Sequence, residues 1–203
     1  MKIGVIGAGN IGGTIGKKWA EQGHEVIFGL RDPSSPKYQE LLEAIDGEAR
    51  TATIAEAVEQ AEAILFAIPS SAMEETAAIL GNKLDGKIIL DATNKFSQAV
   101  ANSLATLQKH APQAKLFRAF NYLGWENFAE PFIGDTQADL FYCGNAGEAQ
   151  HIVEKLISDV GIRPVYLGDL DQAPVLDALL RLWVTLAVQQ GKGRHLAFKM
   201  LKE

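Results

Sequence analysis

Short runs of apolar, often β-branched residues alternate with amphipathic stretches along most of the chain. Such a run is typical of a buried strand, whereas apolar residues recurring at three- and four-residue spacing are typical of a helix. The clearest helical pattern covers 148–160. A weak strand is predicted at 49–52, and seven clearer ones at 2–6, 25–28, 63–68, 87–90, 116–119, 140–143 and 164–166.

Two helix starts have the spacing of a capping box, in which two side chains satisfy free amides of the first turn. They are Thr53 with Glu56, and Ser71 with Glu74. Strands that alternate with helices predict an α/β fold, a Rossmann-type doubly wound and mostly parallel sheet with helices on both faces.

Near residue 168 the alternation stops, and the remaining chain has a helical pattern. Gly191 and Gly193 are predicted to break this pattern before a final short helix. We therefore divide the chain into a dinucleotide-binding domain, 1–168, and a helical C-terminal segment, 169–203. This segment is predicted to cap the site or to form a dimer interface.

Gly7, Gly9 and Gly12 form the pattern G-x-G-x-x-G directly after the first predicted strand and at the start of a helix. The first glycine permits a tight turn, the second lets the backbone approach a pyrophosphate, and the third allows close packing of helix on strand. Free amides and the helix dipole then face the phosphates. The motif in this context predicts dinucleotide binding.

The end of the second predicted strand indicates which dinucleotide is bound. An acid that grips the ribose of NAD usually stands there, about 20 residues after the glycine turn. This chain has Gly29 at that place and Arg31 two residues later, and a guanidinium suits a 2′-phosphate. We predict NADP(H), while Asp32 leaves a ribose contact of the NAD type open.

Composition narrows the class of protein. The 203 residues are 47% hydrophobic and 22% charged, which excludes a disordered chain. The net charge of −6 disfavours nucleic acid and acidic membranes as partners. The single Cys143 fits a reducing compartment, and neither a signal peptide nor a membrane span is recognisable, so a cytoplasmic location is expected. No metal site is expected, because the four histidines are scattered.

Taken together, these segments resemble a known family, the NADPH-dependent coenzyme F420 reductases, which pass hydride between NADP and a deazaflavin. The chain is also similar to the cytosolic oxidoreductase domain of six-transmembrane ferric reductases, which passes hydride to a flavin. The motifs that carry the resemblance are Gly7–Gly12, Gly29-Leu30-Arg31, Ala67-Ile68-Pro69, Asp91-Ala92-Thr93-Asn94, Phe120-Asn121, Cys143-Gly144, Gly161-Ile162-Arg163-Pro164 and Gly191–Gly193.

The resemblance implies a cofactor site along one crevice, in which Arg31 holds the 2′-phosphate, and Asn94 and Asn121 approach the nicotinamide. The implied cofactor-binding residues are Gly7, Gly9, Asn10, Ile11, Gly12, Arg31, Ile68, Pro69 and Asn94. The chain departs from the family at two points. Leu30 stands where the deazaflavin enzymes often have Ser, and Ser70 stands where they can have Trp.

Hydride transfer between stacked rings needs alignment more than acid–base side chains, because the cofactors carry the chemistry. Asn94, Asn121 and Tyr122 are the candidate catalytic residues. A ketone or imine acceptor would need a proton donor, for which Tyr122, Lys95 and His195 are the candidates.

Three functions follow from these observations. The first is an NADPH-dependent oxidoreductase with a flavin-like acceptor: coenzyme F420 first, then FMN, FAD or a ferric chelate through flavin. The second is a reductase of a small carbonyl or imine, although 35 residues after Gly168 are few for a substrate domain. The third is a non-catalytic NADP-binding regulator.

Two aromatic or apolar features complete the analysis. Trp125, in a loop rich in glycine and aromatic residues, could stack on an acceptor ring or pack under that loop. An apolar stripe with helical spacing predicts core or a homodimer contact through the C-terminal helices: Leu176, Leu179, Leu180, Trp183, Leu186 and Ala187.

Overall fold

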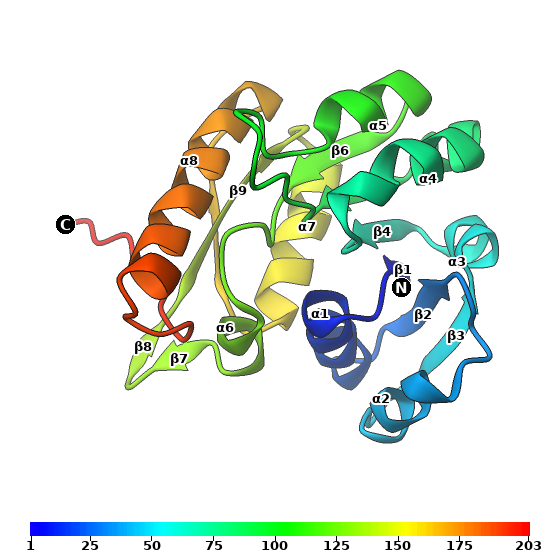
Figure 1. Cartoon of the computed structure of the whole chain (residues 1–203), viewed down its shortest axis with the longest axis horizontal. Helices are drawn as coiled ribbons and strands as arrows, with labels where there is room; N and C mark the ends of the chain where they lie inside the picture. Colours follow the sequence, from blue (N-terminus) through cyan, green and yellow to red (C-terminus); the bar gives the residue numbers. More distant parts are fainter.

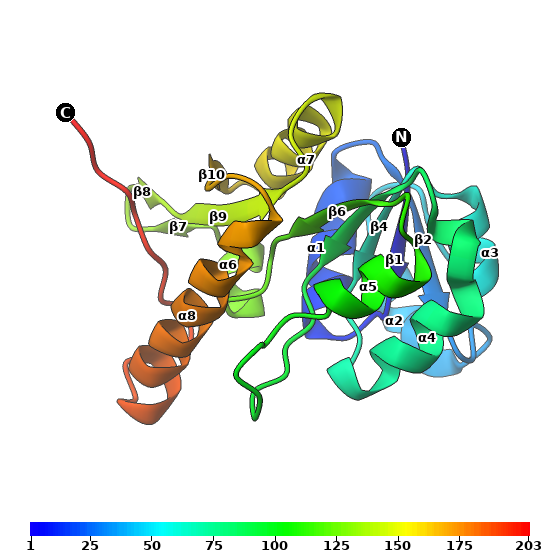
Figure 2. The ribbon, with the colours of Figure 1, turned by 90° about the horizontal axis from the view of Figure 1, so that it is seen from above.

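The computed structural model describes all residues, 1–203, and is built on one eight-stranded sheet (Figure 1). Helices cover both faces: α4 and α5 lie together on one side, and α1 and α7 on the other (Figure 2). From one edge to the other the strands are β10 (Arg163–Tyr166), β9 (Asp139–Gly144), β6 (Lys115–Arg118), β5 (Ile88–Asp91), β4 (Ala63–Phe66), β1 (Lys2–Ile6), β2 (Glu25–Leu30) and β3 (Ala49–Thr53).

Eight α-helices connect or flank these strands. They are α1 (Asn10–Glu21), α2 (Gln39–Glu43), α3 (Ile54–Gln60), α4 (Met73–Leu80), α5 (Leu104–His110), α6 (Trp125–Ala129), α7 (Glu148–Asp159) and α8 (Ala173–Val184). Short 3-10 turns are η1 (Pro36–Tyr38), η2 (Ser70–Ala72), η3 (Gly81–Leu84) and η4 (Leu170–Gln172), and a π-helical turn, η5 (Thr185–Gln189), ends α8. A small hairpin joins β7 (Phe132–Ile133) to β8 (Thr136–Gln137).

Strand β1 lies between β2 and β4 and pairs with both in parallel. The chain therefore leaves β1 toward one side of the sheet and crosses back to the other before β4. Such a reversal of strand order opens a crevice at the carboxyl ends of the strands, where ligands bind in this class of fold. The glycine turn after β1 and the loops after β2 and β4 all lie at that edge.

The other half of the sheet carries the one antiparallel junction, because β9 runs antiparallel to β6 while β10 is parallel to β9. Helix α8 lies across this half, on the opposite side of β9 from α7 (Figure 2). The last ten residues follow as an extended tail, in which Phe198 accepts a bond from the Asp139 amide. The parallel core and the antiparallel half together place α8 beside the crevice.

The predicted fold class is confirmed, and the seven predicted strands and the weak one at 49–52 are all present. The capping box at Thr53 and Glu56 is also present. Two expectations were wrong. Ser71 does not cap a helix, because it lies inside η2 and α4 begins only at Met73. No final helix follows Gly193, since the chain there continues as the extended tail.

Candidate functional site

The glycine turn after β1 has the geometry that its sequence predicts. Gly7 has a φ of 98°, and a Cβ on it would lie 2.7 Å from the Ala67 carbonyl oxygen. A Cβ on Gly12 would meet the Gly7 carbonyl oxygen, so helix α1 can pack here only without a side chain. By contrast, nothing lies within 4 Å of a Cβ on Gly9. The space above Gly9 is therefore open to a ligand, at the start of the twelve-residue helix α1.

Next to this turn lies a pocket of about 340 Å³ at the ends of β2 and β4. Ile68 and Pro69, predicted as cofactor contacts, are on its wall, together with Arg31. Lys37 lines it as well and places its ammonium 4.8 Å from the centre of the Tyr38 ring. Neither Arg31 nor Lys37 forms an ion pair, so the pocket presents two free cations.

Packing explains why no acid stands at the end of β2. A Cβ on Gly29 would lie 2.7 Å from the Ile6 Cδ1 atom and 3.0 Å from the Ala57 Cβ atom. The neighbouring acid, Asp32, accepts bonds at Oδ1 from the amide and the hydroxyl of Ser34, at 3.2 and 2.7 Å. Asp32 therefore stabilises its own turn, and it lines the pocket together with the two cations, Arg31 and Lys37.

At the other end of the crevice, beyond β4, Asn94 and Asn121 lie next to each other, and their approach to the nicotinamide stays a prediction. The Asn94 Nδ2 group donates to the Asn121 carbonyl oxygen at 2.7 Å. Phe120, directly before Asn121, has a φ of 58°, which is unusual for a residue other than glycine. Backbone strain of this kind is often found where a fold holds a functional segment in place. Asn94 remains partly accessible, whereas Asn121 is buried.

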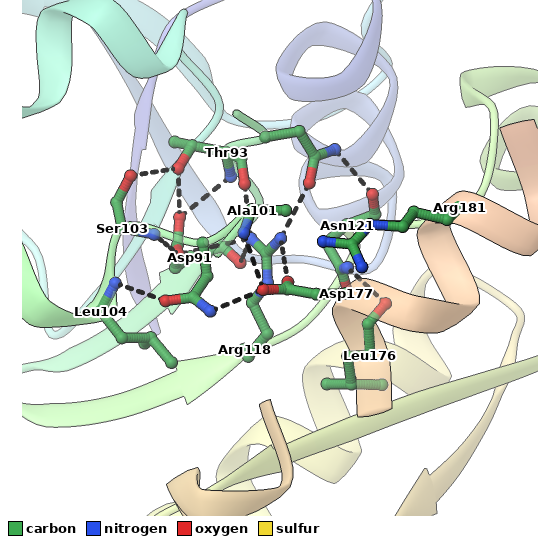
Figure 3. Close-up of polar contacts among 12 residues, drawn as sticks. Asp91, Thr93, Ala101, Ser103, Leu104, Arg118, Asn121, Leu176, Asp177 and Arg181 are labelled. Carbon is green, nitrogen blue, oxygen red and sulfur yellow. Dashed lines mark hydrogen bonds and ion pairs between the residues drawn. The ribbon is translucent and has the colours of Figure 1, made fainter. Parts of the chain in front are cut away.

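A buried polar network fixes this pair of asparagines (Figure 3). At its centre Arg118, fully buried on β6, lies 3.3 Å from the Asp91 carboxylate and 3.1 Å from that of Asp177 on α8. Its NH2 group also donates to the Asn94 side-chain oxygen at 2.8 Å. Since a buried charge is tolerated only when paired, the three charges hold one another in place. Asn94 is thereby oriented by α8 as well as by the sheet.

Sequence reasoning missed Arg118, Asp177 and Lys37. A signal was present for Arg118, because a charged residue inside the apolar run 116–119 must find a partner when the strand is buried. Asp177 could have been recognised in the same way, because it is a charged residue within the apolar pattern of α8. Lys37 follows a turn of Ser and Pro residues and carried no motif that distinguishes it from a solvated lysine.

Tyr122 is corrected from a candidate catalytic residue to a structural one. Its side chain is fully buried, its hydroxyl donates to the Asp139 carbonyl oxygen at 2.8 Å, and it accepts from the Phe141 amide at 2.9 Å. Burial raises the pKa of the phenol far above its usual value. A hydroxyl that is buried and held by two backbone groups has no access to a substrate, so Tyr122 is not available as the proton donor of a carbonyl reduction.

The remaining candidates are dispersed. His195 pairs through Nε2 with the Glu130 carbonyl oxygen, 2.8 Å away, on the exposed side of α6. Trp125 is 36% exposed and begins α6 rather than standing in a loop. Lys95 directly follows Asn94 and has no polar side-chain partner. The residues hold no group of three metal-ligating side chains, and no helix is long and apolar enough to cross a membrane.

Known proteins share this arrangement. Residues 2–95 match the family model described as "NADP oxidoreductase coenzyme F420-dependent". An F420-dependent NADP reductase of Methanothermobacter marburgensis is 26% identical, with 93% of each chain covered. The metalloreductase STEAP3 of Rattus norvegicus is 28% identical over 89% of this chain, which spans 37% of that protein's length.

Among solved structures, a candidate F420-dependent NADP reductase of Arthrobacter sp. FB24 superposes with a TM-score of 0.85, 26% identity and full coverage of both chains. The chain is an NADP-dependent oxidoreductase related to the coenzyme F420-dependent family. A reductive aminase of Aspergillus terreus, solved with NADPH and a keto ester, is also similar, with a TM-score of 0.69 and 26% identity. That match includes 94% of the present chain and 63% of the aminase chain.

The residues of the crevice fit NADP(H). The open space over Gly9 admits a pyrophosphate, and Arg31 and Lys37 are cations of the kind that a 2′-phosphate would require. Asn10 and Ile11 open helix α1 beside Gly9. The individual contacts of these residues with the cofactor stay predictions.

Proposed function

We propose that the oxidoreductase transfers hydride between NADP(H) and a flavin-like acceptor: coenzyme F420 first, FMN or FAD next, or a ferric chelate through flavin. In the reducing direction NADPH gives a hydride to the oxidised ring, a proton comes from solvent, and NADP⁺ and the reduced ring leave. The preference for NADP(H) in this proposal rests on Arg31 and Lys37, two cations without ion-pair partners. They line the pocket beside Gly29, which leaves no room for an acidic side chain.

The proposed flavin-like acceptor is supported by the residues at the end of the crevice where the nicotinamide is expected. Arg118 donates to the Asn94 side chain, which in turn donates to the Asn121 carbonyl oxygen, so the amide of Asn94 is oriented by a buried network. Ring-to-ring hydride transfer depends on alignment of this kind, and the bound cofactor supplies the reducing chemistry. The name of the F420-dependent NADP reductase, whose length this chain matches, points to the same acceptor class.

Reduction of a small carbonyl or imine is the second candidate, favoured by the likeness to the reductive aminase. That reaction needs a proton donor. With Tyr122 buried, the nearest candidate in sequence to Asn94 is Lys95. A non-catalytic regulator is no longer a candidate, because the relatives are named reductases.

The test is oxidation of NADPH and of NADH, followed at 340 nm with coenzyme F420, FMN, FAD and a small ketone with an amine in parallel. We expect NADPH to be oxidised with the flavin-like acceptors, and F420 to be preferred. Turnover with the ketone and amine alone would support the second candidate. NADPH oxidation with none of the acceptors would contradict both.

We further propose a homodimer in the cytoplasm. The predicted stripe is largely core, since Leu176, Leu180 and Trp183 are buried within their own chain. Another face of the C-terminal helical segment is exposed and apolar, with Val175, Leu182 and Val188 about half exposed. We expect light scattering to give the mass of a dimer for the wild-type protein and the mass of a monomer for Leu182→Glu. A monomeric wild-type protein would contradict the proposed homodimer.

A further inference from the structure

A second pocket, of about 460 Å³, lies between the loop after β5 and the C-terminal half of α8 with η5. In Figure 2 this loop lies on the same side of the molecule as the C-terminal half of α8. Lys95 is on the loop side, and Arg181 is on the helix side together with Leu180 and Val184.

The pocket is positive although the protein has a net charge of −6. Neither Lys95 nor Arg181 forms an ion pair, and no acidic residue lines the pocket. Arg181 donates only to the Ala99 carbonyl oxygen, which leaves its charge uncompensated. The nearby carboxylate of Asp177 is bound by Arg118, Asn102 and the Ala101 amide. Two unpaired cations facing one cavity favour an anion.

The pocket also has an apolar rim and adjoins the nicotinamide side of the crevice. Phe96 lines it and is 74% exposed, and Lys95 directly follows Asn94. The Lys95 amide donates to the Ala101 carbonyl oxygen at 2.8 Å, which closes the loop at its base. Its helical wall includes Thr185 in η5, and π-helical turns are rare and frequent at functional sites.

We propose that this pocket binds the anionic part of the hydride acceptor, with Lys95 and Arg181 as partners of a phosphate or carboxylate and Phe96 against the apolar part. The proposal rests on the proposed function, because it names a substrate class for the same active site. It implies that an acceptor with an anionic side chain is preferred over one with the same ring and none.

FMN and riboflavin test this directly, since they share one ring system and differ by a phosphate. We expect kcat/KM for FMN to exceed that for riboflavin at least tenfold. In Lys95→Gln/Arg181→Gln this preference should fall to about twofold or less, because kcat/KM for FMN falls much more than kcat/KM for riboflavin, and the KM for NADPH should stay unchanged. The charge-matched control Arg50→Gln/Lys83→Gln, with both residues outside the pocket, should keep the full preference.

Two competitors separate the sources of the anion. Inhibition of FMN reduction by inorganic phosphate but not by glutarate would assign a phosphate group, and the reverse would assign a carboxylate. Equal loss of FMN and riboflavin reduction in the double variant, or no change in either, would overturn the proposal.

A failure of the proposed function would be distinguishable. If the wild-type protein reduces neither flavin, equilibrium dialysis of FMN and riboflavin against the protein loaded with NADP⁺ tests the pocket alone. Tighter binding of FMN that is lost in the double variant would support the pocket even then. Equal binding of the two flavins would overturn it.

Discussion

At the scale of single residues, the expected preference for NADP(H) over NAD(H) depends on the missing side chain of Gly29 and on the positive charge of Arg31. Gly29 leaves no room for a Cβ between Ile6 and Ala57, so an acid cannot be placed at the end of β2 without moving the sheet or α3. Selection of NADP(H) then falls to cations farther along the loop. Arg31 could be inferred from its position in the sequence, whereas Lys37 could be recognised only once the pocket was known.

We expect Arg31→Ala to raise the KM for NADPH about tenfold or more, because a hydrogen bond to a charged group contributes ~1.5–3 kcal/mol. The KM for NADH, which lacks the 2′-phosphate, should change less than twofold. Steady-state kinetics with both cofactors measure the difference. Arg50→Ala on neighbouring β3 is the control, because that side chain bonds Gln60 outside the pocket. An unchanged KM for NADPH in Arg31→Ala would refute the assignment.

At the scale of elements, Asp139 at the start of β9 holds the C-terminal tail. Its buried carboxylate accepts bonds from Arg163, from Lys199 and from the Met200 amide at 2.6–3.0 Å. Burial by itself would raise the pKa of Asp139, but these donors outweigh it and hold the pKa below its usual value. The ion pairs therefore stabilise the folded state fully above pH ~4, the ordinary value for Asp. This stabilisation is lost as the pH falls through the lowered pKa.

We expect Asp139→Asn to lower the free energy of unfolding at pH 7 by about 2 kcal/mol, in line with lost charge-assisted bonds. The difference from wild type should shrink as the pH drops below ~4, because the unfolded wild-type chain then takes up a proton at Asp139 that the folded state takes up only at lower pH. Urea unfolding at pH 7 and pH 3 measures both. Asp135→Asn, on the exposed turn between β7 and β8, should leave the stability unchanged. A difference from wild type that is equal at both pH values would argue against the ion pairs.

Elements with strong local signals could be predicted from the sequence, and those set by distant contacts could not. The strands of the parallel core and helix α7 follow from their apolar periodicity. The antiparallel direction of β9 depends on where the chain returns after α6, which no local pattern encodes. The tail is extended because its backbone bonds Asp139, a partner about 60 residues away. The family resemblance singled out Asn94 and Asn121, but neither their mutual hydrogen bond nor the buried Arg118 that orients Asn94 could be read from the sequence.

At the scale of the whole molecule, the predicted boundary at 168 separates segments that are energetically joined. Asp177 on α8 bonds Arg118 on β6 and the loop at Ala101, and Trp183 donates to the Leu196 carbonyl oxygen of the tail. Removing one partner of a buried ion pair typically costs ~3–5 kcal/mol, because the other charge stays uncompensated. Helix α8 should therefore unfold with the sheet rather than before it.

Hydrogen exchange followed by mass spectrometry tests this coupling. We expect peptides from α8 and from β1 to exchange with the same free energy of opening in the wild-type protein, because both need global unfolding. Asp177→Ala should lower that energy for α8 by several kcal/mol and lower the preference for FMN, since α8 carries Arg181. Val175→Ala, an exposed position on the same helix, is the matched control. If the amides of α8 exchange with a much lower free energy of opening than those of β1 in the wild-type protein, then the segment 169–203 unfolds independently of the sheet. The helical side of the acceptor pocket would then be mobile.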